Sequence, residues 1–177
     1  LDLDALVAAA NRWRLELKRH QSLMRALAQE EARLQPLQGR ERSASADAPR
    51  HATLAVGHRS RPLRLERWIP QSPRADRTWV LMMPGLGGDP NHFHWLARSL
   101  MQAGWPVLVL EHPGSDAAAV QGLLEGRQSF DGAAALRDRL ADLAAVLEAQ
   151  QRGYLNIPGN EVVLMGHSLG ALTAVLA

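Results

Sequence analysis

The chain has 177 residues, of which 46% are hydrophobic and 21% charged, with no cysteine and a formal net charge of +2. That apolar fraction is normal for a chain that buries a core, so a wholly disordered protein is excluded. No run of about 18 apolar residues is present to span a membrane, and the absence of cysteine excludes disulfides, thiolate nucleophiles and cysteine-bound zinc.

Charge is distributed unevenly along the chain. Residues 1–70 carry 13 Lys and Arg against 8 Asp and Glu, whereas residues 71–177 carry 7 against 10. A basic segment can contact phosphates or a membrane surface, but here charges of both signs alternate, which favours a solvated helix face. We expect no nucleic-acid partner. No signal peptide is visible, so a cytoplasmic location is the default; a chain that begins without methionine leaves secretion open.

The first predicted element is a helix over residues 3–35, ended by Pro36. It carries an apolar stripe at spacings of three and four residues, which can cover a core or bind a partner helix. Residues 38–50 are small and polar and are typical of a linker. The sequence therefore predicts a helical segment over 1–37, this linker, and a second domain over 51–177.

The second domain begins with two short strands, predicted over 51–57 and 62–69 as a hairpin. Further on, three compact apolar strands alternate with helices, and this pattern is typical of a parallel sheet covered on both faces. We therefore expect an α/β fold. The predicted strands lie at 78–83, 106–110 and 161–165. The predicted helices lie at 89–104 with Asp89 as cap, at 116–125 and at 171–177, and a further helix is capped by Asp131 and has Leu136, Leu140, Leu143 and Leu147 along one side.

The motif with the clearest chemistry is GHSLG at residues 166–170, which fits the G-x-S-x-G nucleophile elbow. Such an elbow is a sharp strand-to-helix turn that exposes the serine hydroxyl, so Ser168 is the predicted nucleophile. Gly166 and Gly170 are needed because strand and helix cross too closely there for side chains. The alternative is an ordinary glycine-rich turn in which the serine only caps the helix.

A second motif, PGLGG at residues 84–88, directly follows the strand over 78–83. An elbow serine needs two backbone N–H donors for the oxyanion, one from the residue after it and one from a loop after an earlier strand. Leu169 and Leu86 are placed to supply them. Other interpretations of the glycines fail on spacing, since neither G-x-G-x-x-G nor G-x-x-x-x-G-K-[ST] is present.

These motifs, together with EHPGS at 111–115, resemble the bacterial, largely cyanobacterial, predicted dienelactone hydrolase group of the α/β-hydrolase superfamily. That group is itself similar to platelet-activating-factor acetylhydrolases. The resemblance covers residues 79–177 and implies the first half of a three-layer α/β-hydrolase sheet. True dienelactone hydrolases use a cysteine nucleophile, whereas this chain has Ser168, so a serine carboxylic-ester hydrolase is the better expectation.

The catalytic triad is incomplete in this sequence. In this fold the acid and the histidine follow the serine, and the nine residues after Ser168 contain neither. Among upstream histidines, His112 is a candidate for the rim of the pocket, and His92, His94 and His167 are expected to be structural. We therefore expect a fragment truncated after its nucleophile, inactive alone, with residues 161–165 as an exposed apolar edge that lowers solubility.

The function predicted is hydrolysis of small carboxylic esters through an acyl-enzyme on Ser168, with no cofactor and no metal. An acyltransferase or a thioesterase on the same fold remains an alternative, because pocket shape decides the acceptor. A non-catalytic interaction protein that binds partners through its amino-terminal helix is another. An Asp and a late His encoded after Ala177 would favour the enzyme.

Overall fold

A computed structural model gives the fold, and it describes Ser22 and residues 48–177. The chain divides into two units, Leu1–Ser43 and Ala44–Ala177, and apart from Ser22 the described residues belong to the second. The predicted amino-terminal helix and nearly all of the predicted linker therefore lie outside the described residues.

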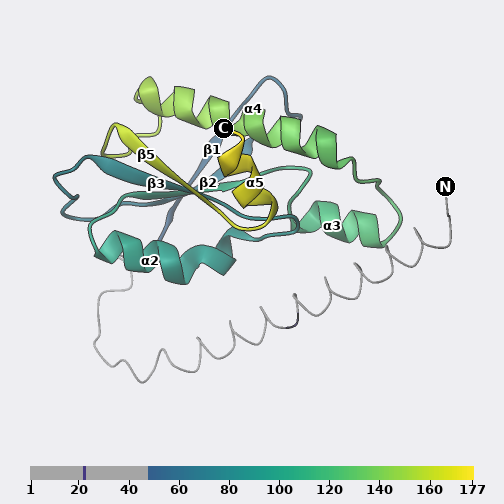
Figure 1. The fold of residues 1–177 in the computed structure, drawn as a ribbon, viewed down its shortest axis with the longest axis horizontal. Helices are drawn as coiled ribbons and strands as arrows, with labels where there is room; N and C mark the ends of the chain where they lie inside the picture. The colour runs from purple at the N-terminus through teal and green to yellow at the C-terminus, as the bar shows by residue number, and fades with distance from the viewer. Residues whose placement is uncertain (1–21, 23–47) are drawn as a thin grey trace. The chain divides into compact units, whose positions relative to one another are not determined.

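One mixed sheet of five strands forms the centre of the second unit (Figure 1). Its strands are β1 (Arg50–Leu54), β2 (Leu63–Trp68), β3 (Thr78–Met83), β4 (Val107–Glu111) and β5 (Glu161–Gly166). They lie in the order β1-β2-β4-β3-β5. β2 is antiparallel to both β1 and β4, while β4, β3 and β5 are parallel. The predicted hairpin and the predicted parallel sheet are both confirmed, and β1 begins one residue earlier than predicted.

Helices alternate with the strands, and three of them begin at an aspartate. Asp89 accepts a hydrogen bond from the N–H of Asn91, as predicted, although the turn it caps is a 3₁₀ helix. Asp116 and Asp131 cap the two helices that follow β4. These carboxylates satisfy N–H groups that have no acceptor within the helix. The helices are the 3₁₀ helix Pro90–Phe93, α2 (His94–Gln102), α3 (Ala117–Leu124), α4 (Gly132–Gln151) and α5 (Leu169–Val175).

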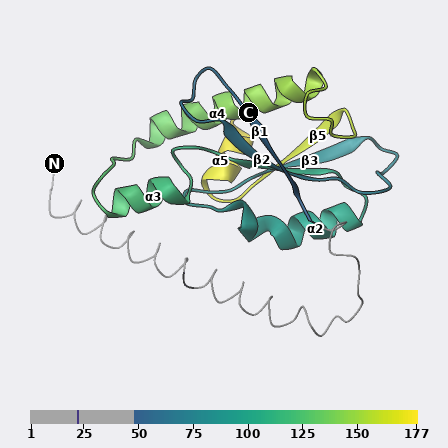
Figure 2. The same ribbon diagram turned by 180° about the vertical axis from the view of Figure 1, so that it is seen from behind.

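The sheet separates two apolar layers, because side chains of a strand alternate between its faces. In β3, Trp79 and Leu81 join the core cluster that contains Leu143 of α4, whereas Val80 and Met82 join the cluster that contains Met101 of α2. Figures 1 and 2 show α4 on one side of the sheet and α2 on the other. This arrangement brings the ends of β3 and β5 together beside α5.

The structure corrects two details of the sequence prediction. The helix after the elbow starts at Leu169, directly after the serine, and ends at Val175. The buried side of α4 is also different from the predicted leucine stripe, since Leu143 is fully buried while Arg139 and Asp142 are buried beside it. The helical period alone selects apolar residues, and so it passes over charged side chains that have buried partners.

β5 lies at one edge of the sheet and pairs only with β3. Its Val162 and Val163 are 36% and 42% exposed, and Leu172 and Val175 of the following helix are exposed as well. An edge strand with apolar side chains has one row of unpaired backbone groups and is therefore a site of association. Within residues 48–177, no helix is both long and apolar enough to cross a membrane.

Candidate active site

Ser168 occupies a sharp turn between β5 and α5. Its backbone has φ 53° and ψ −120°, a combination outside the allowed regions for residues with a side chain. Such a conformation costs on the order of 1–3 kcal/mol. The residue is exposed, and although it holds the N-cap position of α5, its side chain makes no capping hydrogen bond. The alternative of a serine that only caps the helix therefore does not fit.

The glycines on either side of the serine have no room for a side chain. A Cβ on Gly166 would lie 2.2 Å from the carbonyl carbon and oxygen of Gly170. A Cβ on Gly170 would lie 2.0 Å from the carbonyl oxygen of Met83 and 2.8 Å from that of Pro84. The elbow helix thus packs directly against the end of β3, for the steric reason that the sequence motif implies.

The loop over residues 84–88 lies against the elbow. A Cβ on Gly85 would be 3.0 Å from the Ser168 Cβ, so the loop and the serine are immediate neighbours. The N–H of Gly87 donates to the carbonyl of Ser115 at 2.8 Å, and the N–H of Gly88 donates to the carbonyl of Gly85 at 3.1 Å. Leu86 lies between these fixed points.

Both residues predicted as oxyanion donors adjoin this junction. Leu169 is the first residue of α5, where a backbone N–H has no acceptor within the helix. Leu86 is half-buried at the centre of the loop that abuts the serine. The structure thus brings the two segments together, and the role of each N–H stays a prediction.

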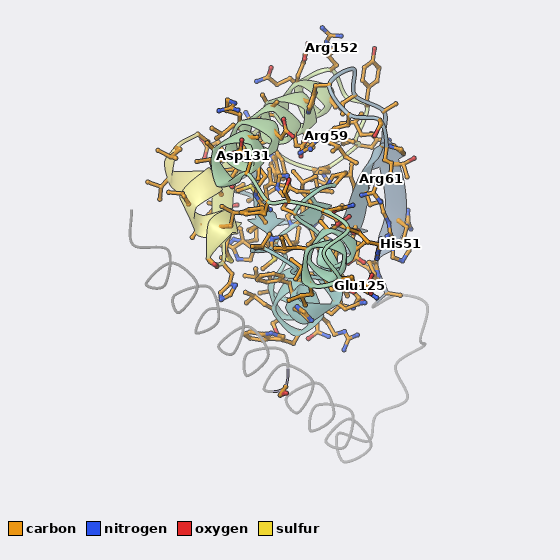
Figure 3. The ribbon with its side chains drawn as sticks, turned by 90° about the vertical axis from the view of Figure 1, so that its right-hand side faces the viewer. His51, Arg59, Arg61, Glu125, Asp131 and Arg152 are labelled. Carbon is orange, nitrogen blue, oxygen red and sulfur yellow. The ribbon has the colours of Figure 1, made fainter. Side chains whose placement is uncertain are left out.

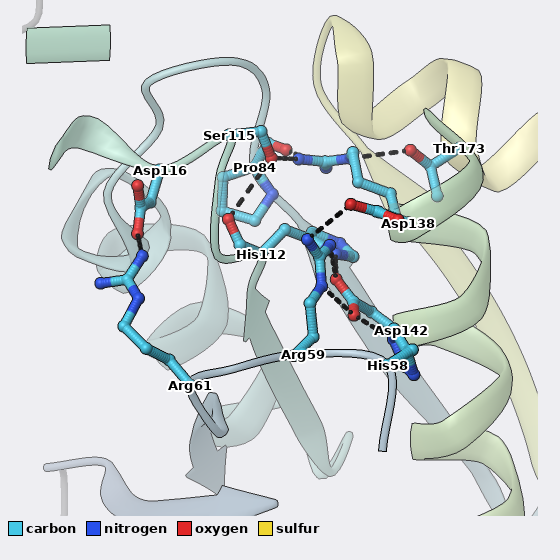
Figure 4. A network of polar contacts seen from close by, with 11 residues as sticks. His58, Arg59, Arg61, Pro84, His112, Ser115, Asp116, Asp138, Asp142 and Thr173 are labelled. Atoms are coloured by element: carbon cyan, nitrogen blue, oxygen red, sulfur yellow. Dashed lines mark hydrogen bonds and ion pairs between the residues drawn. The ribbon is translucent and has the colours of Figure 1, made fainter. Parts of the chain in front are cut away.

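His112 is buried rather than surface-exposed. The residue is 2% exposed, and its Nδ1 lies 2.9 Å from the Oδ2 of Asp142 (Figure 4). Because a carboxylate only accepts, the proton is on Nδ1, and Nε2 is buried without a hydrogen-bond partner. The histidine is a structural member of the layer below the loop.

The carboxylate of Asp142 contacts three basic side chains, those of His58, Arg59 and His112. His58 Nε2 lies 2.7 Å from Oδ1, and the guanidinium of Arg59 donates to both carboxylate oxygens, at 2.9 and 2.6 Å. Arg59 also donates to Asp138 at 2.9 Å, and Figure 3 shows it beside α4. These bonds tie the segment between β1 and β2 to the middle of α4.

His112 and Asp142 both have shifted pKa values, and the causes of the two shifts differ. Burial lowers the pKa of His112 to about 4, despite its bond to Asp142, and the cations Arg139 and Arg59 act in the same direction. Burial alone would raise the pKa of Asp142, but hydrogen bonds from His112, Arg59 and His58 lower it to about 2. At neutral pH the pair is therefore a neutral imidazole on an ionised carboxylate.

Stability is expected to fall as the pH drops from about 6.5 to about 4. Over that window His112 is protonated in the unfolded chain and neutral in the folded protein. Because the unfolded state binds more protons, the free energy of unfolding decreases as the pH falls. The expected loss is roughly 3 kcal/mol at most. Urea unfolding of His112→Phe across this range measures it, with His51→Gln as the control for loss of a histidine. An unchanged pH slope in His112→Phe contradicts the expectation.

Of the other predicted structural histidines, His167 directly precedes Ser168, whereas His92 and His94 lie in and after the 3₁₀ helix Pro90–Phe93. His94 Nε2 is 2.7 Å from the Oε2 of Glu66, which connects α2 to β2. The backbone N–H of His167 donates to Met83 at 3.2 Å. Among residues 48–177 no group of three or more acidic or histidine side chains is arranged to hold a metal ion.

The surface hollows in the described part of the second unit include two that Ser168 does not line. One is formed at the start of β3 by Arg74, Arg77 and Asn160, among others. The second lies beside the hairpin, next to His51 and Glu66.

Solved structures of similar fold include esterases. A ferulic acid esterase from Streptomyces cinnamoneus aligns with a TM-score of 0.58 at 18% identity, over 73% of this chain and 54% of its own. A thermophilic esterase from Thermogutta terrifontis aligns with a TM-score of 0.52 at 16% identity, over 73% of this chain and 44% of its own. The chain has an α/β-hydrolase fold. It spans about half the length of these esterases.

Esterase 2 of Thermogutta terrifontis also matches in a form phosphorylated by paraoxon, with a TM-score of 0.51 at 19% identity, over 76% of this chain and 49% of its own. No protein-family model matches this chain, and no curated protein is significantly similar to it in sequence. The evidence for the fold is thus structural.

Sequence reasoning missed the two charged residues of α4 that lie beneath this α/β-hydrolase elbow. Arg139 and Asp142 are 1% and 0% exposed, yet both stand within a run of charged residues that looks like a solvated face. The available signal was their spacing of three, which places them on one side of a helix together with Leu143 and Val146. Their partners are far away in sequence, so no local pattern identifies them.

Proposed function

We propose that this chain carries the nucleophile and the oxyanion donors of a serine hydrolase that cleaves carboxylic esters. The observation that carries the proposal is the backbone of Ser168, a non-glycine residue at φ 53° and ψ −120° whose side chain caps nothing. Strain of this kind persists only where the surrounding structure enforces it, and it clusters at active sites.

In the proposed reaction the Ser168 Oγ attacks the ester carbonyl carbon and forms the new C–O bond of a tetrahedral intermediate. The former carbonyl oxygen takes the negative charge and accepts hydrogen bonds from the N–H groups of Leu86 and Leu169. Collapse breaks the bond to the leaving oxygen, which gains a proton and departs as the alcohol. Water then cleaves the acyl group from Ser168 and releases the carboxylic acid.

The proton of the serine needs a general base. In this fold the triad follows the chain order Ser, Asp or Glu, His, and residues 169–177 contain none of these partners. We propose that sequence encoded after Ala177 supplies the acid and the histidine. Without a general base and its orienting acid, the serine hydroxyl is a weak nucleophile.

Two considerations support an ester as the substrate. The structures of similar fold are esterases, and one of them is a form phosphorylated by paraoxon. The chain also lacks cysteine, so it cannot use the thiolate of true dienelactone hydrolases. The narrower resemblance to the predicted dienelactone hydrolase group stays a prediction.

Two other functions fit the same fold. An acyltransferase or a thioesterase would use the same serine and differ in acceptor or leaving group. A non-catalytic interaction protein would have no need of a strained, uncapped serine, so the geometry of Ser168 favours the enzyme. We therefore retain ester hydrolysis as the proposed function.

A fluorophosphonate probe tests the proposal in the full-length gene product. The probe phosphonylates activated serines, so we expect labelling of Ser168 and loss of labelling in Ser168→Ala, together with loss of hydrolysis of short-chain p-nitrophenyl esters. Ser99→Ala is the matched control, because Ser99 is an exposed serine whose hydroxyl bonds the carbonyl of Trp95 in α2. Labelling that persists in Ser168→Ala rejects Ser168 as the nucleophile.

A further inference from the structure

Arg139 is a buried cation in the middle of α4, with 1% of its surface exposed. Its guanidinium has three hydrogen-bond partners, all of them neutral. Nε donates to the Thr173 Oγ1 at 3.0 Å, Nη1 donates to the Ser115 Oγ at 2.8 Å, and Nη2 donates to the carbonyl of Pro84. The planar, forked guanidinium can serve three acceptors in different directions at once.

The three acceptors come from three separate segments around the elbow. Pro84 opens the loop that carries Leu86, Ser115 follows β4, and Thr173 lies in α5 one turn after Leu169. Figure 4 shows these three residues, converging from different parts of the chain, with their dashed contacts. Arg139 thus connects the loop and the helix that carry the two proposed oxyanion donors.

The connections continue to the residues beside those donors. The Thr173 hydroxyl donates to the carbonyl of Leu169 at 2.8 Å. The carbonyl of Ser115 accepts from the N–H of Gly87 at 2.8 Å, directly after Leu86. Hydrogen bonds of the guanidinium therefore lead through Thr173 to the carbonyl of Leu169, and through Ser115 to Gly87 beside Leu86.

Stability alone does not explain a cation at this position. Removing an arginine from water is costly, and a buried ion is often replaced by an apolar side chain without loss of stability. Leu143 and Val146 show that the same side of α4 accepts apolar residues. Burial lowers the pKa of Arg139 to about 10, so the group is still charged at neutral pH. The Asp142 carboxylate on the same helix favours the charged form, but all three hydrogen-bond partners lie beside the elbow. A cation that is costly to bury and bonds only to these segments indicates a functional constraint.

We propose that Arg139 is a positioning residue of the oxyanion hole. It fixes the loop that carries the Leu86 N–H relative to the helix that carries the Leu169 N–H, so that both point to one oxyanion. This inference rests on the proposed ester hydrolysis. Oxyanion donors act through placement, and a displacement of about 1 Å can lower a rate about 100-fold.

The test compares Arg139→Met and Arg139→Lys with the wild type in the full-length gene product. The rate is divided by the concentration of active sites titrated with a fluorophosphonate. We expect Arg139→Met to lower kcat about 10-fold to 100-fold with KM changed less than about threefold, because the transition state depends on the oxyanion more than the bound ester does. Arg139→Lys keeps the charge but cannot reach three acceptors, so we expect an intermediate kcat.

Val146→Ala is the matched control for lost stability. Val146 is fully buried in the same helix and belongs to the sheet-facing core, so this variant lowers Tm without removing a hydrogen bond of the Arg139 guanidinium. A merely structural Arg139 would lower Tm and leave kcat per active site within about twofold, as we expect for Val146→Ala. The affinity of a trifluoromethyl ketone, which forms a tetrahedral adduct with an oxyanion, should fall with kcat/KM in Arg139→Met alone.

Three outcomes are distinguishable. A wild-type kcat in Arg139→Met overturns the inference and leaves the proposed function intact. A wild type that neither hydrolyses esters nor takes up the probe rejects the proposed function, and the inference with it. If Arg139→Met does not fold, Thr173→Val and Ser115→Ala each remove one contact of the guanidinium, and wild-type kcat in both overturns the inference.

Discussion

Alanine in place of Gly170 is expected to destabilise the folded protein by more than about 4 kcal/mol, a magnitude reserved for severe core strain. The added Cβ would lie 2.0 Å from the carbonyl oxygen of Met83 and 2.8 Å from that of Pro84. Both atoms are backbone at the end of β3, so no side chain can move aside. Relief requires α5 to separate from the sheet.

The measurement is urea unfolding of the full-length gene product, followed by circular dichroism. Gly132→Ala is the matched control, because Gly132 is also helical and its added Cβ would lie 3.6 Å from the ring of Phe130, an ordinary contact. That control should be neutral or stabilising by about 0.5–1 kcal/mol, since alanine restricts the unfolded chain. Equal stabilities of the two alanine variants would refute the steric argument.

The contact between Gly170 and β3 explains why the elbow could be predicted from sequence. The spacing of Gly166, Ser168 and Gly170 encodes a local steric requirement, and the flanking apolar runs supply the strand and the helix that cross there. The loop at 84–88 was placed by the same reasoning, since it follows the adjacent parallel strand. Short-range patterns therefore predicted the fold and the junction that contains Ser168.

The layer beneath that junction could not be predicted in this way. Arg139 reaches Pro84 across 55 positions of sequence, and Asp142 reaches Arg59 across 83. The helical period places these two residues on the side of Leu143 and Val146, but it does not identify the partners that allow charged groups to be buried there. Only tertiary structure determines which charged side chains of α4 are buried, because burial depends on partners that other segments provide.

Asparagine in place of Asp142 is the second substitution with a large expected effect. Asp142 is 0% exposed and accepts hydrogen bonds from His58, Arg59 and His112. Asparagine removes the negative charge and presents an N–H₂ group to one of these donors. The largely buried guanidinium of Arg59 then loses its buried carboxylate and keeps the half-exposed Asp138 as its ion-pair partner. Breaking one side of a buried ion pair costs about 3–5 kcal/mol, and urea unfolding at pH 7 measures that cost.

Asp138→Asn provides the control, because Asp138 pairs with the same Arg59, 2.9 Å from its Nη1, on the same helix. The Asp138 side chain is 51% exposed, so solvent screens its charge and the expected cost is below about 1 kcal/mol. Both variants replace an aspartate that pairs with Arg59 by asparagine, and they differ in how deeply the aspartate is buried. A similar loss of stability in both would mean that burial of Asp142 does not set the strength of this pair. A large loss confined to Asp142→Asn identifies the carboxylate as the group that ties the β1–β2 segment to α4 beneath the elbow.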